Sequence, residues 1–184
     1  MRSKASRLIS LILICAVLLC SCNSKADQSG IAGQCSQYIG DTDYSSTISA
    51  LVYEQIPGEE DGGSGIVYKV VTDPEGLLSQ NTVPVCLYFY SSMDAGEMTG
   101  ITAGVEDLAQ MLSDQVLFVA LDGITQSQLS SRYAVEAYPE FVLIVPGKEP
   151  VKFEGMRYDE WTIYDVTAWL SANGYTADMS KLEG

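Results

Sequence analysis

The central and C-terminal parts of the chain contain short apolar runs separated by polar turns. Four runs rich in β-branched and aromatic residues have the length of strands, at 66–71, 83–90, 116–121 and 141–145. The runs VPVCLYFY and VLFVAL lack polar alternation, which is typical of strands buried on both faces of a sheet. A turn signal, Pro-Gly-Lys, follows the fourth run and predicts a hairpin partner at 151–153.

Helical signals occupy the segments between the strands. Apolar residues at helical spacing, together with helix start and stop signals, predict helices at 74–80, 94–113, 126–133 and 159–173. Asp73 followed by Pro74 is a typical N-cap and first helical residue. The order β-α-β-α-β-α-β-β-α predicts an α/β domain with a mixed central sheet flanked by helices.

The first 21 residues have the pattern of a secretory signal peptide. Three basic residues precede the apolar run LISLILICAVLL, which is shorter than the about 20 residues that span a bilayer. The run ends in Leu-Cys-Ser-Cys, which resembles the lipobox of bacterial lipoproteins, with Cys22 as the residue that receives palmitate or a similar lipid. We therefore expect an extracytoplasmic protein anchored to a bacterial cell membrane at Cys22. The alternative is an ordinary signal peptide with an incidental cysteine.

The segment after the leader lacks a periodic apolar pattern. Residues 23–46 are rich in Ser, Gly, Asp and Gln, which favours a flexible tether over 22–62. Within it, 47–56 is ambiguous between a strand and a short helix. The folded domain is then expected at 63–175, followed by a C-terminal tail at 176–184.

The charge balance narrows the range of partners and chemistries. The chain has 10 Lys+Arg, 24 Asp+Glu and no histidine, for a net charge of −14. Three of the basic residues lie in the leader, so the remainder carries 7 basic against 24 acidic residues, a net charge of −17. Such a chain repels phosphate, so nucleic acid is excluded as a partner. Without histidine, Ser-His-Asp and Cys-His catalytic systems are excluded as well.

Two sequence stretches carry a family resemblance. The strand PVCLYFY at 84–90 resembles the central strand that leads into the thioredoxin active-site helix. The stretch LSSRYAVEAYP at 129–139 is similar to the Leu-Ala-x-x-Tyr-x-Val-x-x-x-Pro pattern of the same family. The resemblance covers about 66–174 and implies the thioredoxin fold. It also implies that Pro139 is a cis-proline that faces the active site. The cis form is accessible because it costs little free energy at an X-Pro bond.

The resemblance fails at the residues that perform the chemistry. The sequence MDAGE at 93–97 stands where thioredoxins have Trp-Cys-x-x-Cys, so Asp94 and Glu97 replace the two thiols. Glu140 stands where a Thr usually follows the cis-proline, and Tyr88 aligns with a strand carboxylate that assists proton transfer. Disulfide exchange needs a low-pKa attacking thiolate and a resolving thiol. We therefore predict a redox-inactive member without a cofactor.

The replacing carboxylates have two interpretations. Asp94 and Glu97 stand at a helix start with the spacing of a capping box, where they also suit the positive end of the helix dipole. Alternatively, Asp94, Glu97 and Glu140 form an acidic cluster that recognises a basic peptide or a cation such as Ca²⁺. The site residues predicted for a peptide groove are Pro139, Tyr138, Glu140 and Met93, although the nearby tyrosines are equally consistent with rings that close the core.

Cys35 and Cys86 are the cysteines expected to remain as thiols after processing and lipidation. Cys86 lies inside a predicted buried strand, where a cysteine acts as a small apolar residue. Cys35 lies in the predicted tether. It would pair with Cys86 only if that segment folded back on the core, or it would pair with a thiol of another molecule. The preferred hypothesis is a non-catalytic, membrane-anchored module that binds a peptide or protein partner. The alternatives are a divergent thiol–disulfide oxidoreductase or isomerase in envelope redox homeostasis, and a scaffold within a larger envelope assembly.

Overall fold

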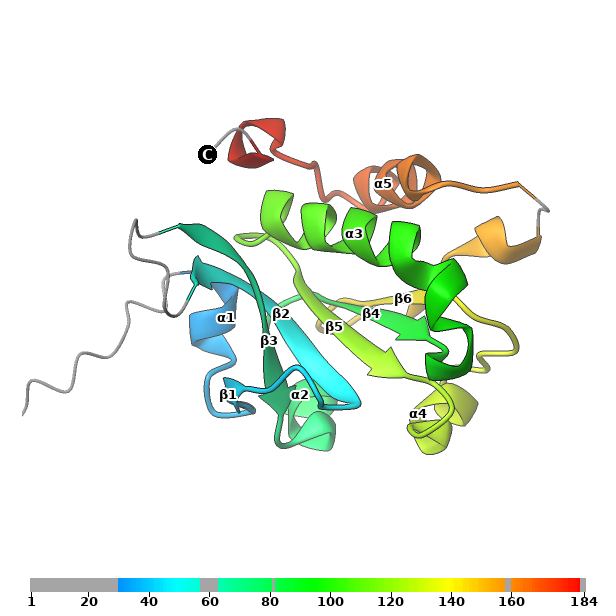
Figure 1. Cartoon of the computed structure of the whole chain (residues 1–184), viewed down its shortest axis with the longest axis horizontal. Coiled ribbons are helices and arrows are strands. Elements are labelled where there is room, and N and C mark those ends of the chain that lie inside the picture. The colour runs from blue at the N-terminus through cyan, green and yellow to red at the C-terminus, as the bar shows by residue number, and fades with distance from the viewer. Residues whose placement is uncertain (1–29, 57–62, 81, 158–159, 183–184) are drawn as a thin grey trace, which may run out of the picture.

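One seven-stranded mixed sheet forms the centre of the protein (Figure 1). The structure is a computed structural model and describes residues 30–56, 63–80, 82–157 and 160–182. The strand order is β1-β3-β2-β5-β4-β6-β7, in which β4 and β5 are parallel and the other neighbours are antiparallel. The strands are β1 Ile39–Thr42, β2 Ile48–Gln55, β3 Ser64–Val71, β4 Val85–Tyr90, β5 Leu117–Asp122, β6 Glu140–Ile144 and β7 Val151–Lys152.

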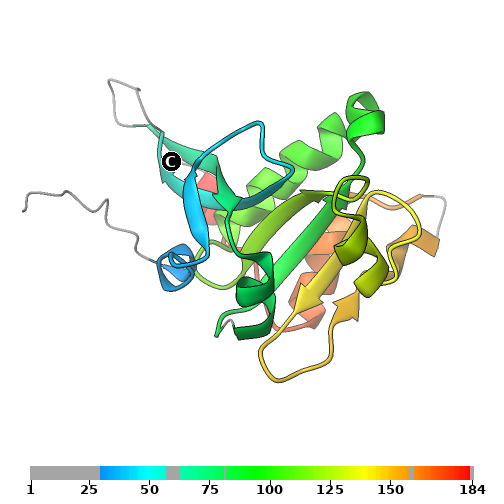
Figure 2. The same ribbon diagram turned by 90° about the horizontal axis from the view of Figure 1, so that it is seen from below.

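Helices cover both faces of this sheet. The helices are α1 Ile31–Gln34, α2 Pro74–Gln80, α3 Ala95–Met111, α4 Ser127–Arg132 and α5 Ile163–Ala172. Helices α3 and α5 lie on one face, while α1, α2 and α4 lie on the other (Figure 1), and the view from below in Figure 2 shows the second layer. The predicted α/β class with a mixed, helix-flanked sheet is confirmed. The elements predicted between 66 and 173 are all present, with ends that differ by a few residues.

The central strands are buried on both faces, as their unbroken apolar runs predict. In β4, Leu87 and Phe89 are fully buried in the cluster that includes side chains of α1, α2 and α4. The alternate residues Cys86 and Tyr88 are buried in the cluster beneath α3 and α5. Side chains of a strand point alternately to the two faces, so β4 contributes to both halves of the core.

The prediction of a flexible tether is wrong for residues 30–46. Residues of α1 and its C-terminal end belong to the core, with Ile31 5% and Cys35 0% exposed. Strand β1 extends the sheet beside β3, and the ambiguous segment 47–56 is strand β2, inserted between β3 and β5. Helix α1 and strand β1 have four residues each, which is too short to produce a periodic apolar pattern. The folded domain therefore begins well before the predicted boundary at 63.

The predicted C-terminal tail is also partly folded. The amide of Gln115 donates a hydrogen bond to the carbonyl oxygen of Thr176 at 2.9 Å, and Ala177 packs against the cluster beneath α3 and α5. The leader and Cys22 lie outside the described residues. Within the parts of the chain that are described, no helix is long and apolar enough to cross a membrane.

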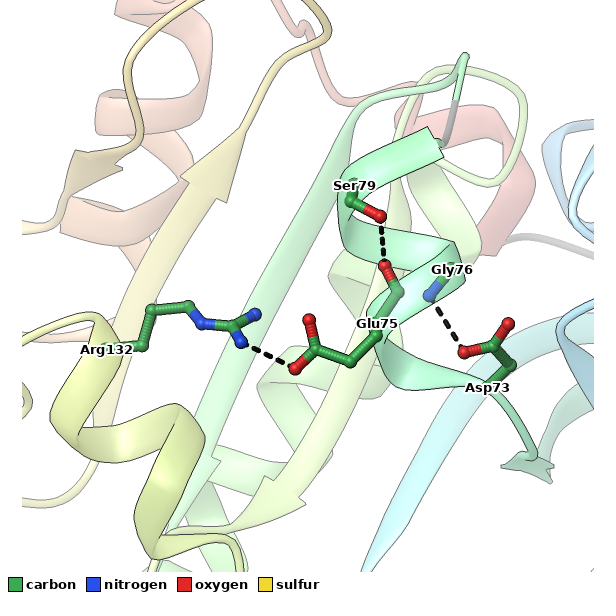
Figure 3. Close-up of polar contacts among 5 residues, drawn as sticks. All are labelled: Asp73, Glu75, Gly76, Ser79 and Arg132. Atoms are coloured by element: carbon green, nitrogen blue, oxygen red, sulfur yellow. Dashed lines mark hydrogen bonds and ion pairs between the residues drawn. The ribbon is translucent and has the colours of Figure 1, made fainter.

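Polar contacts join α2 to α4, which leads towards the predicted cis-proline (Figure 3). The Asp73 carboxylate accepts a hydrogen bond of 2.8 Å from the Gly76 N–H, so the predicted N-cap is confirmed. The Arg132 guanidinium forms an ion pair with Glu75, whose carbonyl oxygen accepts a hydrogen bond from the Ser79 hydroxyl. The C-terminal end of α4 therefore contacts the first turn of α2 through an exposed ion pair.

Candidate functional site

The segment before β6 contains a cis peptide bond between Tyr138 and Pro139, as the family resemblance implies. Pro139 is buried and Tyr138 is half-buried. The Tyr138 ring occupies the space beside Gly123, where an added Cβ would lie 2.0 Å from Cε1 of the ring. The Tyr138 hydroxyl donates to Ser130 Oγ at 3.5 Å, and Ser130 Oγ donates to the Gly123 carbonyl oxygen at 2.9 Å. Tyr138 therefore packs against Gly123 in the loop after β5, where it needs a glycine, and its hydroxyl bonds to Ser130 of α4.

Asp122, at the end of β5, joins the two loops that follow β4 and β5. Its carboxylate accepts hydrogen bonds from the Ser92 N–H at 3.2 Å and the Ser92 hydroxyl at 3.0 Å. It also accepts a hydrogen bond of 3.2 Å from the Ile124 N–H. The Gly123 N–H donates to the Tyr90 carbonyl oxygen at 2.8 Å, which adds a backbone link between the same two loops. Asp122 is only 2% exposed, so this carboxylate is a structural centre of the site.

The electrostatics of Asp122 favour its ionised form. Burial by itself raises the pKa of the Asp122 carboxyl, but the hydrogen bonds from Ser92 and Ile124 outweigh it, so the pKa is lower than the ordinary value of 3.8. Hydrogen bonds to an ionised acceptor are shorter and stronger than neutral ones. The two loops are thus tied to a permanent negative charge at neutral pH.

The tied loops present apolar side chains to solvent. Met93, in the 3-10 turn Ser92–Asp94, is 80% exposed, and Ile124 is 47% exposed. Both residues are anchored close to Asp122. Met93 directly follows Ser92, whose N–H bonds to the Asp122 carboxylate, and the N–H of Ile124 itself bonds to the same carboxylate. The predicted groove residue Met93 therefore lies on an accessible surface, together with Ile124, which the sequence analysis did not identify.

Asp94 does not cap α3 in the predicted manner. It occupies the N-cap position, but its side chain makes no capping hydrogen bond within the described structure. The preceding 3-10 turn, closed by a hydrogen bond of 3.2 Å from the Asp94 N–H to the Ser91 carbonyl oxygen, gives Asp94 a φ of −113° and a ψ of 27°. This is not the extended conformation that a capping side chain usually requires. The side chain of Glu97 lies outside the described part of the structure.

Glu140 lies on the opposite face of the sheet from α3. In β6, Phe141 belongs to the cluster beneath α3 and α5, while Glu140 and Val142 alternate with it and point to the α4 face. The Glu140 carboxylate is paired with Lys152 Nζ at 3.2 Å, and Lys152 Nζ also donates to the Ala134 carbonyl oxygen at 2.8 Å. The predicted acidic cluster of Asp94, Glu97 and Glu140 is therefore wrong at Glu140. Among the described residues, no group of three acidic or cysteine side chains is placed to hold a metal ion.

The two described cysteines are poorly suited to thiol chemistry. Cys86 is fully buried in β4, and burial raises the pKa of its thiol far above the ordinary value of 9.0. Burial also raises the pKa of the Cys35 thiol, to about 11. Neither cysteine is part of a disulfide, so the pairing of Cys35 with Cys86 is not present. Since the thiolate is the reactive form, burial disfavours both residues as nucleophiles at neutral pH.

Comparison with known proteins identifies the family. The thioredoxin family model matches residues 71–166, which is more than half of the chain, so the protein belongs to the thioredoxin family. The chain is 28% identical over 79 residues to "Thioredoxin Y, chloroplastic" of Oryza sativa subsp. japonica, and this match covers 43% of the chain. It spans 46% of that relative, or about half its length.

Solved structures of thioredoxins and related domains are also similar. The germline-specific thioredoxin Deadhead of Drosophila melanogaster matches with a TM-score of 0.43 and 21% identity over 50% of this chain and 82% of that one. The first thioredoxin domain of mouse protein disulfide-isomerase A4 matches with a TM-score of 0.44 and 22% identity over 53% of this chain and 67% of that one.

Asp122 is the main site residue that sequence reasoning missed. The signal in the sequence is an acid that ends the apolar run VLFVAL and precedes a glycine. An acid at this place is also common in a simple turn, so the pattern does not show that its side chain bonds to a loop 30 residues earlier.

Proposed function

We propose that the protein is a membrane-anchored, extracytoplasmic lipoprotein whose thioredoxin domain binds an extended peptide or protein segment beside Pro139 without performing disulfide exchange. The observation that carries the proposal is the link through Asp122, which holds two loops so that Met93 and Ile124 are exposed together beside the site. Exposed apolar side chains on a rigid support favour binding, because less conformational entropy is lost when the partner arrives.

The chemistry of the site supports binding over redox catalysis. Where thioredoxins have two thiols, this chain has Asp94 and Glu97. The buried thiols of Cys35 and Cys86 have raised pKa values, so the alternative of a thiol–disulfide oxidoreductase is not favoured. The expected partner segment has apolar side chains that contact Met93 and Ile124. Basic residues beside them would complement the net charge of −14 of this chain.

The membrane location is supported by the leader pattern. A basic start, a short apolar run and Leu-Cys-Ser-Cys are the expected parts of a lipoprotein signal ending at Cys22. Lipid attachment is tested by expressing the full chain in bacteria and following incorporation of labelled palmitate. We expect labelled protein in the membrane fraction and loss of the label in Cys22→Ala, and retention of the label in that variant would contradict the lipidation site.

Peptide binding is tested by selecting peptides from a display library against the purified protein and measuring their affinities. We expect Met93→Asp and Ile124→Asp each to weaken binding at least about ten-fold, because a charge replaces apolar contact in the interface. Met179→Asp is the matched control, since Met179 is 64% exposed and lies at the other end of α3. Equal affinities for all three variants would overturn the proposed groove.

A redox assay separates the two functions. Insulin reduction by the purified protein is expected to equal the rate without protein. Turnover that disappears in Cys86→Ser would overturn the non-catalytic proposal.

A further inference from the structure

A tyrosine-rich pocket is lined by side chains of α3 and of strands β2, β3, β4 and β5. These elements meet on the face of the sheet that α3 covers, and α4 lies on the other face (Figure 1). It has a volume of about 180 Å³. Its floor includes Ser49 of β2, and its walls include Tyr68 of β3, Tyr88 and Tyr90 of β4 and Thr102 of α3. Tyr44, which is 68% exposed, stands at the rim with its ring centroid 5.8 Å from that of Tyr68, so the pocket opens to solvent beside this residue.

Ser49 is the feature that points to a ligand. The residue is 2% exposed, and its hydroxyl has no hydrogen-bond partner in the part of the chain that is described. A buried polar group without a partner is costly, and native structures contain few of them. The alternation of β2 places Ser49 on the same face as Leu51, beneath α3, so its hydroxyl lies towards the pocket.

Several other hydroxyl groups of the pocket already have partners. The Tyr68 hydroxyl donates to Glu106 Oε1 at 2.6 Å, and the hydroxyls of Tyr88 and Thr102 lie 3.1 Å apart within hydrogen-bond distance. No charged side chain lines the pocket among the described residues. The walls therefore offer ring faces and edges, and the floor offers the buried Ser49 hydroxyl, which has no partner among the described residues.

We propose that this pocket binds a small, uncharged aromatic ring that carries one hydrogen-bonding group, of which phenol is the simplest example. A cavity of about 150 Å³ lined by apolar side chains holds benzene, so the size of this pocket suits one six-membered ring with a small substituent. The ring packs against the tyrosine side chains in offset or edge-to-face geometry. Its polar substituent satisfies the Ser49 hydroxyl. The same chemistry is offered by a free phenol and by a tyrosine side chain of a partner.

The inference does not depend on peptide binding at Pro139. It concerns a different set of side chains, and only Tyr90, which precedes the loop with Met93, lies close to the candidate site. The two proposals are therefore tested separately.

The test is calorimetric titration of the purified protein with phenol and with toluene, followed by protein-observed NMR. We expect saturable phenol binding, with shifts confined to residues around the pocket. Ser49→Ala is expected to weaken phenol binding about five-fold, the value of one net hydrogen bond, and to leave toluene binding unchanged. Ser79→Ala, which alters an exposed serine in α2, is the matched control and is expected to bind phenol like the wild type.

A second variant keeps the test decisive. Ala120 of β5 lies opposite Ser49 and is 5% exposed, so Ala120→Val adds two methyl groups to the pocket and is expected to abolish binding of both ligands. N-acetyl-tyrosinamide distinguishes a free phenol from a partner's tyrosine as the natural ligand. If the natural ligand is a tyrosine side chain, this compound binds with at least the affinity of phenol. If the pocket admits only free phenols, it binds much more weakly. The absence of saturable phenol binding, or equal phenol affinity in wild type and Ser49→Ala, overturns the proposal.

Discussion

Asp122 and Glu140 are two buried carboxylates at the same end of the sheet, and their surroundings differ. In the register of the sheet, Asp122 lies opposite Tyr90 of β4, and Glu140 lies opposite Phe89, the preceding residue. Because successive residues of β4 point to opposite faces, Asp122 faces α3 while Glu140 faces α4. The two acids are 2% and 5% exposed, but Glu140 is surrounded by more protein than Asp122.

The hydrogen-bond donors around each carboxylate and the depth of its burial together explain the difference. Asp122 accepts two backbone N–H groups and a hydroxyl, and its pKa is lowered. For Glu140, burial is the largest influence and raises the pKa, and the ion pair with Lys152 and the hydrogen bond from the Phe141 N–H compensate only in part. The two acids therefore differ in role. Asp122 organises the functional loops, whereas Glu140 is tolerated because a lysine reaches it.

Removal of the Asp122 carboxylate should have the largest effect. We expect Asp122→Ala to lower the free energy of unfolding by about 2–3 kcal/mol, because the N–H groups of Ser92 and Ile124 lose an ionised acceptor. Peptide binding should fall with it, since Met93 and Ile124 lose their common support. Urea denaturation measures the first effect and peptide titration the second.

Two controls make the Asp122 prediction specific. Asp94→Ala removes an exposed acid from the same loop and should change stability by less than about 0.5 kcal/mol. Asp122→Asn keeps one side-chain oxygen as an acceptor and should cost less than Asp122→Ala. If Asp122→Ala and Asp94→Ala are equally mild, the carboxylate does not organise the loops.

Breaking the ion pair on the other face should have a smaller effect. Lys152→Met leaves a buried Glu140 without its cation, and we expect a loss of about 1–2 kcal/mol at pH 7, reduced by the partial exposure of the lysine. Adding Glu140→Gln should recover most of the loss, because the uncompensated charge is gone. Lys148→Met, at an exposed turn, is the control and should be neutral. If Lys152→Met alone is as stable as the wild type, Glu140 does not need the lysine for stability.

The pH dependence of stability should have opposite signs for the two acids. The pKa of Asp122 is lower in the folded state, so its stabilising contribution is present above its unfolded value near 3.8 and is lost as the pH falls through the folded pKa. The pKa of Glu140 is raised, so its contribution is complete below its unfolded value near 4.5 and is lost as the pH rises through the folded pKa.

Thermal unfolding between pH 3 and pH 7 measures both contributions. Asp122→Asn should flatten the acid-induced loss of stability below pH 4. Glu140→Gln should remove a decline in stability above about pH 4.5. If Asp122→Asn and Glu140→Gln change the pH dependence of stability in the same direction, the two carboxyls do not have opposite pKa shifts.

Removal of the unpartnered Ser49 hydroxyl should change the free energy of unfolding least among these substitutions. Ser49→Ala is expected to raise the free energy of unfolding by up to about 1 kcal/mol, because an unsatisfied polar group is removed from the interior. Ser130→Ala is the matched control, since the Ser130 hydroxyl is buried and donates to Gly123, and it should destabilise by about 1 kcal/mol. Destabilisation by Ser49→Ala equal to that by Ser130→Ala would show that Ser49 has a partner in the folded protein.

Parts of the molecule with strong local patterns were predictable. The unbroken apolar runs predicted β4 and β5, the helical spacing of apolar residues predicted α3, and Asp73-Pro74 predicted the start of α2. Elements of four residues, such as α1 and β1, were missed because they are shorter than the periods that would reveal them. Strand β2 was ambiguous because a central strand does not alternate in polarity.

The residues of the candidate site also divide into those that were predictable from the sequence and those that were not. The cis-proline was predicted from a spaced motif, and the sequence contains no Cys-x-x-Cys motif. The replacement of the two thiols by Asp94 and Glu97 stays a prediction from the family resemblance. The acidic cluster was not predictable, since proximity of Glu140 to Pro139 in the chain does not give the face of the sheet to which its side chain points. Asp122 was missed because its partners Ser92 and Ile124 come from different loops.

The sequence by itself determined the class of fold, the absence of the thioredoxin thiol pair and the absence of histidine chemistry, because each depends on residue types at fixed local spacing. Only the tertiary structure decided that Cys35 is buried, that Glu140 faces away from α3, that Asp122 ties two loops and that Ser49 lines a pocket without a bonded partner. These facts depend on which strands are neighbours and on which face each residue lies. A one-residue change of register reverses that face, so such contacts are properties of the assembled sheet.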